Sequence, residues 1–194
     1  MTSHSKITAP NNYFLLLGLP VSFDIDKKTL NHNYHELQKT VHPDKFASAS
    51  DRERMLSVQK AAQINDALET LKNPQRRSAY LLSLFGIDLG ENDSSVDPVF
   101  LMEQMELREA LSQVEESDDP LGKLDDILAH VKSRIKAAVM ALDTQFQAIL
   151  ANDITEQEQQ KRLAQVKSET LKMQFLNRLQ EEAMNKEEDL ANQL

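Results

Sequence analysis

The stretch LQKTVHPDKFASAS, residues 37–50, decides how the N-terminal part of the chain folds. An apolar pattern at helical spacing runs up to Val41, and Pro43 ends it because proline lacks a backbone N–H and clashes with the preceding turn. The small and polar residues that follow predict a loop. On local grounds the tripeptide His42-Pro43-Asp44 could be part of a metal site, an acid–base pair or an ordinary turn.

The segment before the tripeptide is expected to form a helix over about 26–41. At 100° per residue, one side of this helix carries the apolar set Leu30, Tyr34, Leu37 and Val41. The opposite side carries Lys28, His32, His35 and Lys39. The histidines are therefore expected to face solvent on a basic strip, and the rigid corner should present His42 and Asp44 beside Lys39 and Lys45.

A second long helix is expected over about 51–72, antiparallel to the first. Its predicted core stripe is Val58, Ala61, Ala62, Asn65 and Leu68. Further helices are expected at about 12–19, 76–86, 98–115, 121–151 and 156–190. Only four glycines and six prolines occur in 194 residues, so the predicted fold class is all-α.

Charge and turn-forming residues divide the chain. Residues 1–85 carry 11 Lys and Arg against 8 Asp and Glu, whereas residues 86–194 carry 11 against 23. The densest cluster of turn formers lies between them. We expect a flexible tail over 1–11, a helical module over 12–85, a linker over 86–97 and a three-helix bundle over 98–194.

Composition excludes several classes of function. The absence of cysteine excludes disulfides and thiolate chemistry, and the net charge of −9 argues against general nucleic-acid binding. The apolar runs are too short to cross a membrane. The N-terminus has no secretion signal, so a cytoplasmic protein is expected.

A metal site is the main catalytic alternative. His32 and His35, spaced i,i+3, could chelate a metal, and with Glu36 they resemble zinc-hydrolase helices. The spacing matches neither H-E-x-x-H nor H-x-x-E-H, and no third ligand is evident. A solvated polar face is the favoured interpretation.

The helix at 97–111 has two apolar faces. Val99, Phe100, Leu107, Ala110, Leu111 and Val114 are expected to form its core face. A second patch of Leu101, Met102 and Met105, edged by Glu106 and Glu109, points away from the core. Exposed methionine-rich patches are typical of protein-binding surfaces. Burial of both faces between two neighbouring helices is the alternative.

HPD between two such helices resembles the J domain, the module that activates heat-shock ATPase chaperones. YFLLLGLP (13–20) and INDALETLKNPQRRSAYLL (64–82) are similar to its first helix and to its third helix with the segment that follows. The resemblance implies that the chaperone ATPase binds His42, Pro43 and Asp44, with Lys28, His35, Lys39 and Lys45 as supporting surface. Val41 stands where many J domains have tyrosine, and the basic strip is weaker than in general-purpose members.

FLMEQMELREAL, HPDKFA and YLLSL together resemble the HscB family of co-chaperones for iron–sulfur cluster assembly. This implies two partners: the scaffold protein IscU, bound by the C-terminal bundle, and the chaperone ATPase HscA, recruited by the J domain. The scaffold-binding positions would be Leu101, Met102, Met105, Glu106, Glu109 and Phe175. The cysteine-bearing extension of mitochondrial relatives is lacking, which favours a bacterial-type member.

The resemblance implies a protein that is not an enzyme and that needs no cofactor and no metal, because hydrolysis occurs on HscA. The open alternatives are a J-domain co-chaperone for a different client and a metal hydrolase.

Overall fold

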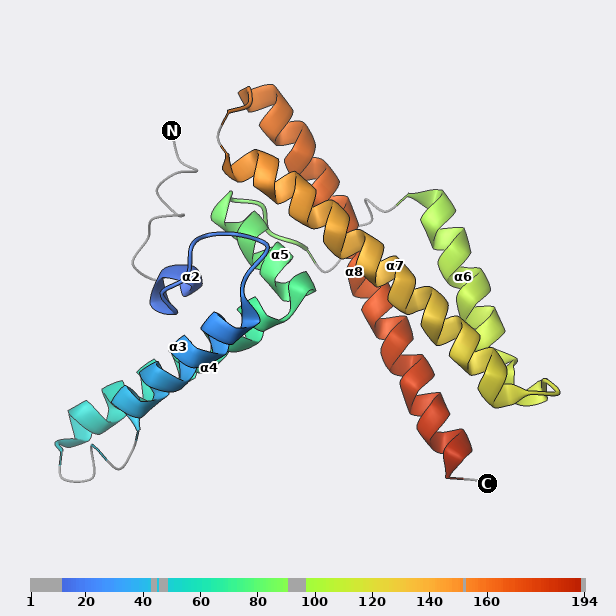
Figure 1. Ribbon diagram of the computed structural model, residues 1–194, viewed down its shortest axis with the longest axis horizontal. Coiled ribbons are helices and arrows are strands. Elements are labelled where there is room, and N and C mark those ends of the chain that lie inside the picture. The colour runs from blue at the N-terminus through green and yellow to red at the C-terminus, as the bar shows by residue number, and fades with distance from the viewer. Residues whose placement is uncertain (1–11, 43–44, 46–48, 91–96, 152, 193–194) are drawn as a thin grey trace. The chain divides into compact units, whose positions relative to one another are not determined.

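A computed structural model describes residues 12–42, 45, 49–90, 97–151 and 153–192. The chain divides into two compact units between Asp88 and Leu89. All regular structure in the described residues is helical, which confirms the predicted all-α class (Figure 1).

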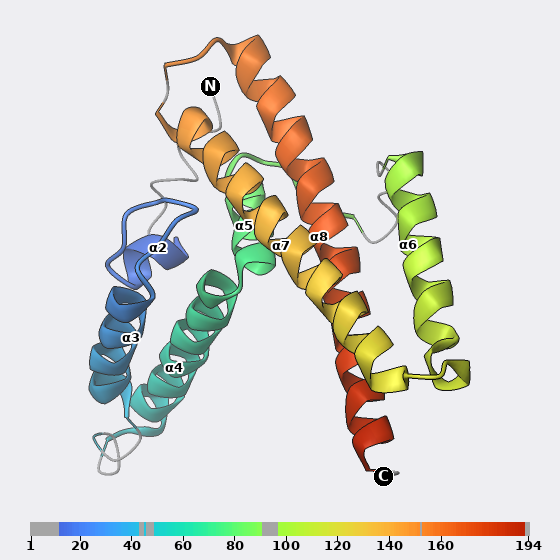
Figure 2. The ribbon, with the colours of Figure 1, turned by 45° about the vertical axis from the view of Figure 1, so that its right-hand side comes forward.

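The described residues of the first unit form four helices: α2 (Tyr13–Leu16), α3 (Lys27–Val41), α4 (Asp51–Lys72) and α5 (Pro74–Leu84). Helices α3 and α4 run antiparallel and lie side by side in both ribbon views (Figures 1 and 2). Helix α2 is shorter than the expected segment 12–19. The chain leaves it through Gly18, whose φ of 63° lies in the left-handed region that glycine tolerates without strain.

Side-chain caps fix where these helices begin. The Asp26 carboxylate accepts hydrogen bonds from the backbone N–H groups of Lys28 and Thr29 at the start of α3. Ser50 and Glu53 form a reciprocal capping box on α4. Asn73 caps α5, with Pro74 in the first turn, so α5 begins two residues before the expected segment 76–86.

The core of the first unit is built from apolar side chains of all four helices and the α2–α3 loop. Its buried members include Phe14, Leu17, Phe23, Leu30, Leu71, Leu81 and Leu82. Arg77 is also buried; its guanidinium donates to the Leu71 carbonyl and lies 4.8 Å from the ring centroid of Phe23. Tyr80 stacks on Tyr13 with ring centroids 4.6 Å apart. These contacts fasten α5 to α2 and to the end of α4.

The predicted core stripe of α4 is wrong at three of its five positions, while Ala61 and Leu68 are half-buried. Val58 is 62% exposed, and Ala62 and Asn65 are also exposed. The buried residues are instead Ser57, Ile64, Ala67 and Leu71. The core of the unit therefore takes this second row of α4, and Val58 is left exposed to solvent.

The second unit contains α6 (Pro98–Ser112), a 3-10 turn η2 (Val114–Glu116), α7 (Pro120–Leu150) and α8 (Glu156–Ala191). Helices α7 and α8 form a long antiparallel hairpin. Helix α6 lies against the half of this hairpin that holds the start of α7 and the end of α8 (Figures 1 and 2).

Apolar residues at steps of three and four along 121–151 predict a packed seam, and most of its members are buried: Leu124, Leu128, Val131, Ala138, Leu142 and Ile149. The other predicted members, Ile135 and Gln145, are half-buried, and Leu121 in the first turn is 38% exposed. One prediction for α6 is wrong: Val99 is 72% exposed, while Phe100, Leu111 and Val114 are buried in the core of the unit.

Candidate functional site

The corner after α3 begins at His42, which is the C-cap residue of the helix. His42 adopts φ −59° and ψ 133°, so the chain leaves the helix in an extended conformation, as expected for a residue before proline. The Lys45 backbone N–H donates a hydrogen bond of 3.0 Å to the His42 carbonyl, so Lys45 lies one turn beyond it. The predicted site residues Pro43 and Asp44 lie outside the described residues.

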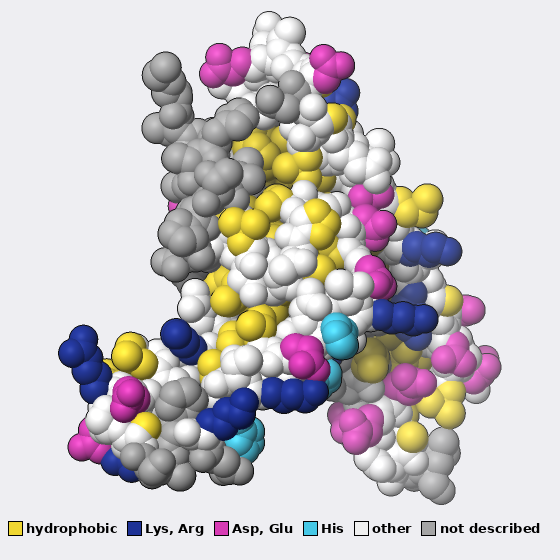
Figure 3. Space-filling model, turned by 60° about the vertical axis from the view of Figure 1, so that its left-hand side comes forward, with side chains coloured by type: hydrophobic (Ala, Val, Ile, Leu, Met, Phe, Trp, Pro, Cys, Tyr) yellow, Lys and Arg dark blue, Asp and Glu magenta, His cyan; other side chains and the backbone are white. Residues whose placement is uncertain are grey.

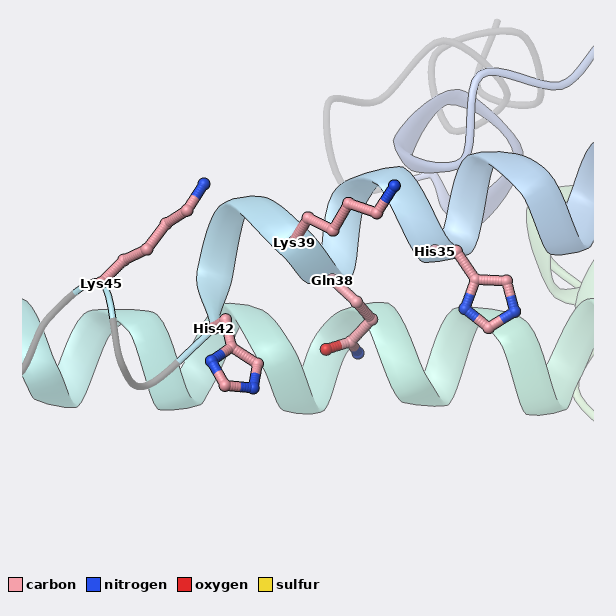
Figure 4. A pocket seen from close by; sticks show the side chains of 5 residues that line it. All are labelled: His35, Gln38, Lys39, His42 and Lys45. Carbon is pink, nitrogen blue, oxygen red and sulfur yellow. The ribbon is translucent and has the colours of Figure 1, made fainter.

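Four of the predicted chaperone-binding residues surround one open depression of about 810 Å³. They are His35, Lys39, His42 and Lys45, and the fifth lining residue is Gln38. His35, Gln38 and His42 follow one another along one side of α3, and the two lysines extend from the other side of the depression (Figure 4). The structure therefore brings an imidazole pair and two ammonium groups together on one exposed surface.

Gln38 also lines the depression, although the sequence pattern did not predict it as a site residue. Its Nε2 donates a 2.6 Å hydrogen bond to the Asn65 side-chain oxygen on α4, and the Tyr34 hydroxyl donates to the same atom at 3.0 Å. The i+3 spacing from His35 and i−4 spacing from His42 could have identified Gln38 as a member of this face.

The basic strip on α3 also contains one carboxylate. Lys39 donates a 2.7 Å hydrogen bond to Glu36, and this bond, together with the lysine charge, lowers the pKa of Glu36. Lys28 and His32 are exposed on the same helix, as expected. In the space-filling view, lysine, arginine and histidine side chains gather in a band low in the picture (Figure 3).

The second predicted surface lies on α6. Leu101, Met102 and Met105 are 40%, 63% and 72% exposed, and Glu106 and Glu109 are exposed beside them. These five residues are called the Met face below. The neighbouring helices leave the Met face exposed. The alternative that both faces of α6 are buried is therefore wrong.

Two further apolar residues lie on or against α6. Val99 lies one turn before Met102 on α6, about 60° from it around the helix, and it is exposed. Phe175 on α8 is only partly buried, and its ring lies edge-on to the ring of Phe100, with centroids 6.3 Å apart. Phe175 therefore contacts α6 through Phe100, on the buried side of that helix.

The metal-hydrolase interpretation receives no support from the described residues. Among them, no group of three or more His, Cys, Asp or Glu side chains is arranged to hold a metal ion. His32, His35 and Glu36 lie on the exposed side of α3.

No helix among the described residues is long and apolar enough to cross a membrane.

Comparisons with known proteins match both units. Residues 12–80 match the DnaJ domain family, and residues 96–184 match the family described as the HSCB C-terminal oligomerisation domain. The co-chaperone protein HscB homolog of Aliivibrio fischeri is 42% identical over 180 residues, which cover 92% of this chain and 98% of the relative. The corresponding protein of Vibrio cholerae is 41% identical over 185 residues.

Two solved structures of HscB proteins have a similar fold. The chaperone HscB from Vibrio cholerae superposes with a TM-score of 0.79 at 40% identity, covering 92% of this chain and 99% of that one. The crystal structure of human co-chaperone protein HscB gives a TM-score of 0.77 at 31% identity, covering 90% and 81%. A J domain followed by an HscB-type C-terminal bundle, with relatives that match along nearly their whole length, places the chain in the HscB family of co-chaperones.

Proposed function

We propose that this protein is a co-chaperone of iron–sulfur cluster biogenesis that acts in the cytoplasm. Its C-terminal bundle binds an IscU-type scaffold through the Met face and Phe175. Its J domain binds an HscA-type chaperone through the tripeptide His42-Pro43-Asp44 and the basic strip, and it stimulates the ATPase activity of that chaperone.

The proposal rests on one observation: the two units expose surfaces of different chemistry, one basic and one apolar. The J domain offers imidazoles and ammonium groups around one depression, which suits an acidic surface on the chaperone. The bundle offers an apolar patch edged by Glu106 and Glu109, which suits an apolar partner with cationic groups at its edge. Two surfaces on two units allow one molecule to hold client and chaperone together.

This function requires no chemistry by the protein itself. ATP is hydrolysed in the active site of the chaperone, and the cluster is carried by the scaffold. The protein is therefore proposed to be no enzyme and to hold no cofactor.

Steady-state ATPase assays of HscA, with and without IscU, test the proposal directly. The wild-type protein should stimulate hydrolysis, and His42→Gln should abolish stimulation while leaving the fold and scaffold affinity unchanged. Lys132→Gln on α7 is the control, since Lys132 is also exposed but lies outside the depression. Stimulation by His42→Gln at the wild-type level would contradict the role of the corner.

A J-domain co-chaperone for a different client is the second candidate. It shares the exposed basic corner but predicts that the Met face binds another protein. Titration of purified IscU distinguishes the two, because only an iron–sulfur co-chaperone should bind it and show scaffold-dependent stimulation of HscA.

A further inference from the structure

We propose that Glu103 and Arg134 are positioning residues for binding at the Met face. Their ion pair holds the first half of α6 against α7, so that the apolar side chains of the Met face are presented in a fixed arrangement. The identity of the protein partner in this inference rests on the proposed function.

Ion pairs hold α6 at both borders of its buried face. Glu103 and Arg108 lie on opposite sides of the row that contains Phe100, at about 60° and 80° from it around the helix. Glu103 is bonded to Arg134 on α7, and Arg108 is bonded to Glu182 on α8. The Met face lies between these borders on the outer side of α6.

The two ion pairs differ in strength. Arg134 Nη1 lies 2.7 Å from Glu103 Oε1, and Arg134 Nη2 donates to Glu103 Oε2 at 2.8 Å. His130 Nε2 lies 3.6 Å from the same carboxylate. The Arg108–Glu182 pair makes a single contact of 3.2 Å, and both of its side chains are about half exposed. A two-pronged, partly buried carboxylate–guanidinium pair is stronger and more directional than a single exposed contact.

The first half of α6 depends on this pair because its apolar anchoring is sparse. Over residues 98–105, Phe100 is the one buried apolar side chain, and the other buried residue is Gln104. The second half is held by buried Leu111 and partly buried Leu107 and Ala110. All three apolar members of the Met face lie in the sparsely anchored half: Leu101, Met102 and Met105.

Loss of the pair should therefore weaken partner binding without removing any contact residue. A first half of α6 that moves more freely must be ordered when the partner binds, and this ordering costs affinity. The Glu103 carboxylate is engaged with α7 and is 27% exposed, whereas Glu106 and Glu109 are exposed beside the Met face. Glu103 thus acts through the position of α6 and not through contact with the partner.

The test compares Glu103→Gln, Arg134→Gln and the charge exchange Glu103→Arg with Arg134→Glu in the full chain. Calorimetric titration with IscU should show about a tenfold loss of affinity for each single change, and the exchange should recover most of it. Hydrogen exchange of the free proteins should show faster exchange at residues 98–105 in the single variants and recovery in the charge exchange. Glu182→Gln, which breaks the weaker pair, should change affinity by less than about twofold.

Three results would overturn the inference. The first is wild-type affinity in both single variants. The second is loss of affinity in Glu103→Gln but not in Arg134→Gln, which would make Glu103 a direct contact. The third is unchanged exchange at residues 98–105. If the wild-type chain fails to bind IscU, the proposed function fails, and the exchange measurement alone still decides whether the pair orders α6.

Discussion

Gln38 on α3 donates a 2.6 Å hydrogen bond to the side-chain oxygen of Asn65 on α4. The bond joins the two long helices of the J domain on the same side of α3 as His35 and His42. Tyr34 donates to the same oxygen at 3.0 Å. Asn65 is therefore the shared acceptor that links the side of α3 bearing His35 and His42 to α4.

We expect Asn65→Ala to destabilise the protein by about 1 kcal/mol, because it removes the acceptor of two partly solvated hydrogen bonds. Gln38→Ala should cost less, since Tyr34 keeps its bond to Asn65. The free energy of unfolding from urea titration measures both changes. A double-mutant cycle between the two positions should give a coupling of roughly 0.5 kcal/mol or more, and strict additivity would contradict the link.

We expect the Gln104 side chain to lower the free energy of unfolding. The residue is 7% exposed, and its Nε2 has no hydrogen-bond partner among the residues that the structure describes. On folding, a buried donor without an acceptor loses its hydrogen bonds to water and forms none within the protein. Gln104→Leu should therefore raise the free energy of unfolding by about 1 kcal/mol.

The matched control is Gln165→Leu, which replaces an exposed glutamine on α8. Its effect should stay within about 0.5 kcal/mol of zero. Equal stabilisation by both changes would assign the effect to helix propensity and not to the orphan donor.

The sequence predicted most of the long helices because their boundaries are local, although α2 is shorter than expected and α5 begins two residues earlier. Asp26, Ser50 and Asn73 are capping residues, and they cap α3, α4 and α5 in the structure. Pro98, at the start of α6, likewise marks the start of a helix at its first turn. Such signals depend on neighbours in sequence and need no knowledge of the tertiary structure.

The face that each helix buries was harder to predict where two apolar rows compete. Helix α4 carries Val58 and Ala62 on one row and Ile64 and Leu71 on another, and the core of the unit takes the second. On α6, Val99 belongs to the apolar sector but lies at the first turn, where it is 72% exposed. Cross-helix bonds such as Gln38–Asn65 depend on the packed helix pair and leave no periodic signal.

The Asp26 cap should make the J domain sensitive to acid. Hydrogen bonds from the Thr29 hydroxyl and from the backbone N–H groups of Lys28 and Thr29 lower the pKa of Asp26 from 3.8. The ionised cap therefore stabilises the fold above the unfolded-state pKa, and this contribution is lost as pH falls through the lower folded-state pKa.

Carboxyl titration by NMR should place the pKa of Asp26 below 3.8. In Asp26→Asn, the stability difference from wild type should be largest near neutral pH and should shrink as the solution is acidified below about pH 4. A difference that stays constant from pH 7 to pH 2 would show that the carboxylate charge contributes nothing to the cap.

The Met face should lose most of its affinity for an IscU-type scaffold when its apolar anchors are truncated. Leu101→Ala combined with Met105→Ala is expected to weaken binding by about 2 kcal/mol or more, because buried apolar anchors dominate such interfaces. Val99→Ala should have a smaller effect, since Val99 lies at the edge of the surface.

Met140→Ala on α7 is the control. Met140 is 63% exposed, as Met102 is, but it lies outside the Met face. Calorimetric titration measures all of these variants, and equal affinities for the double variant and the Met140 control would refute the assignment of the Met face.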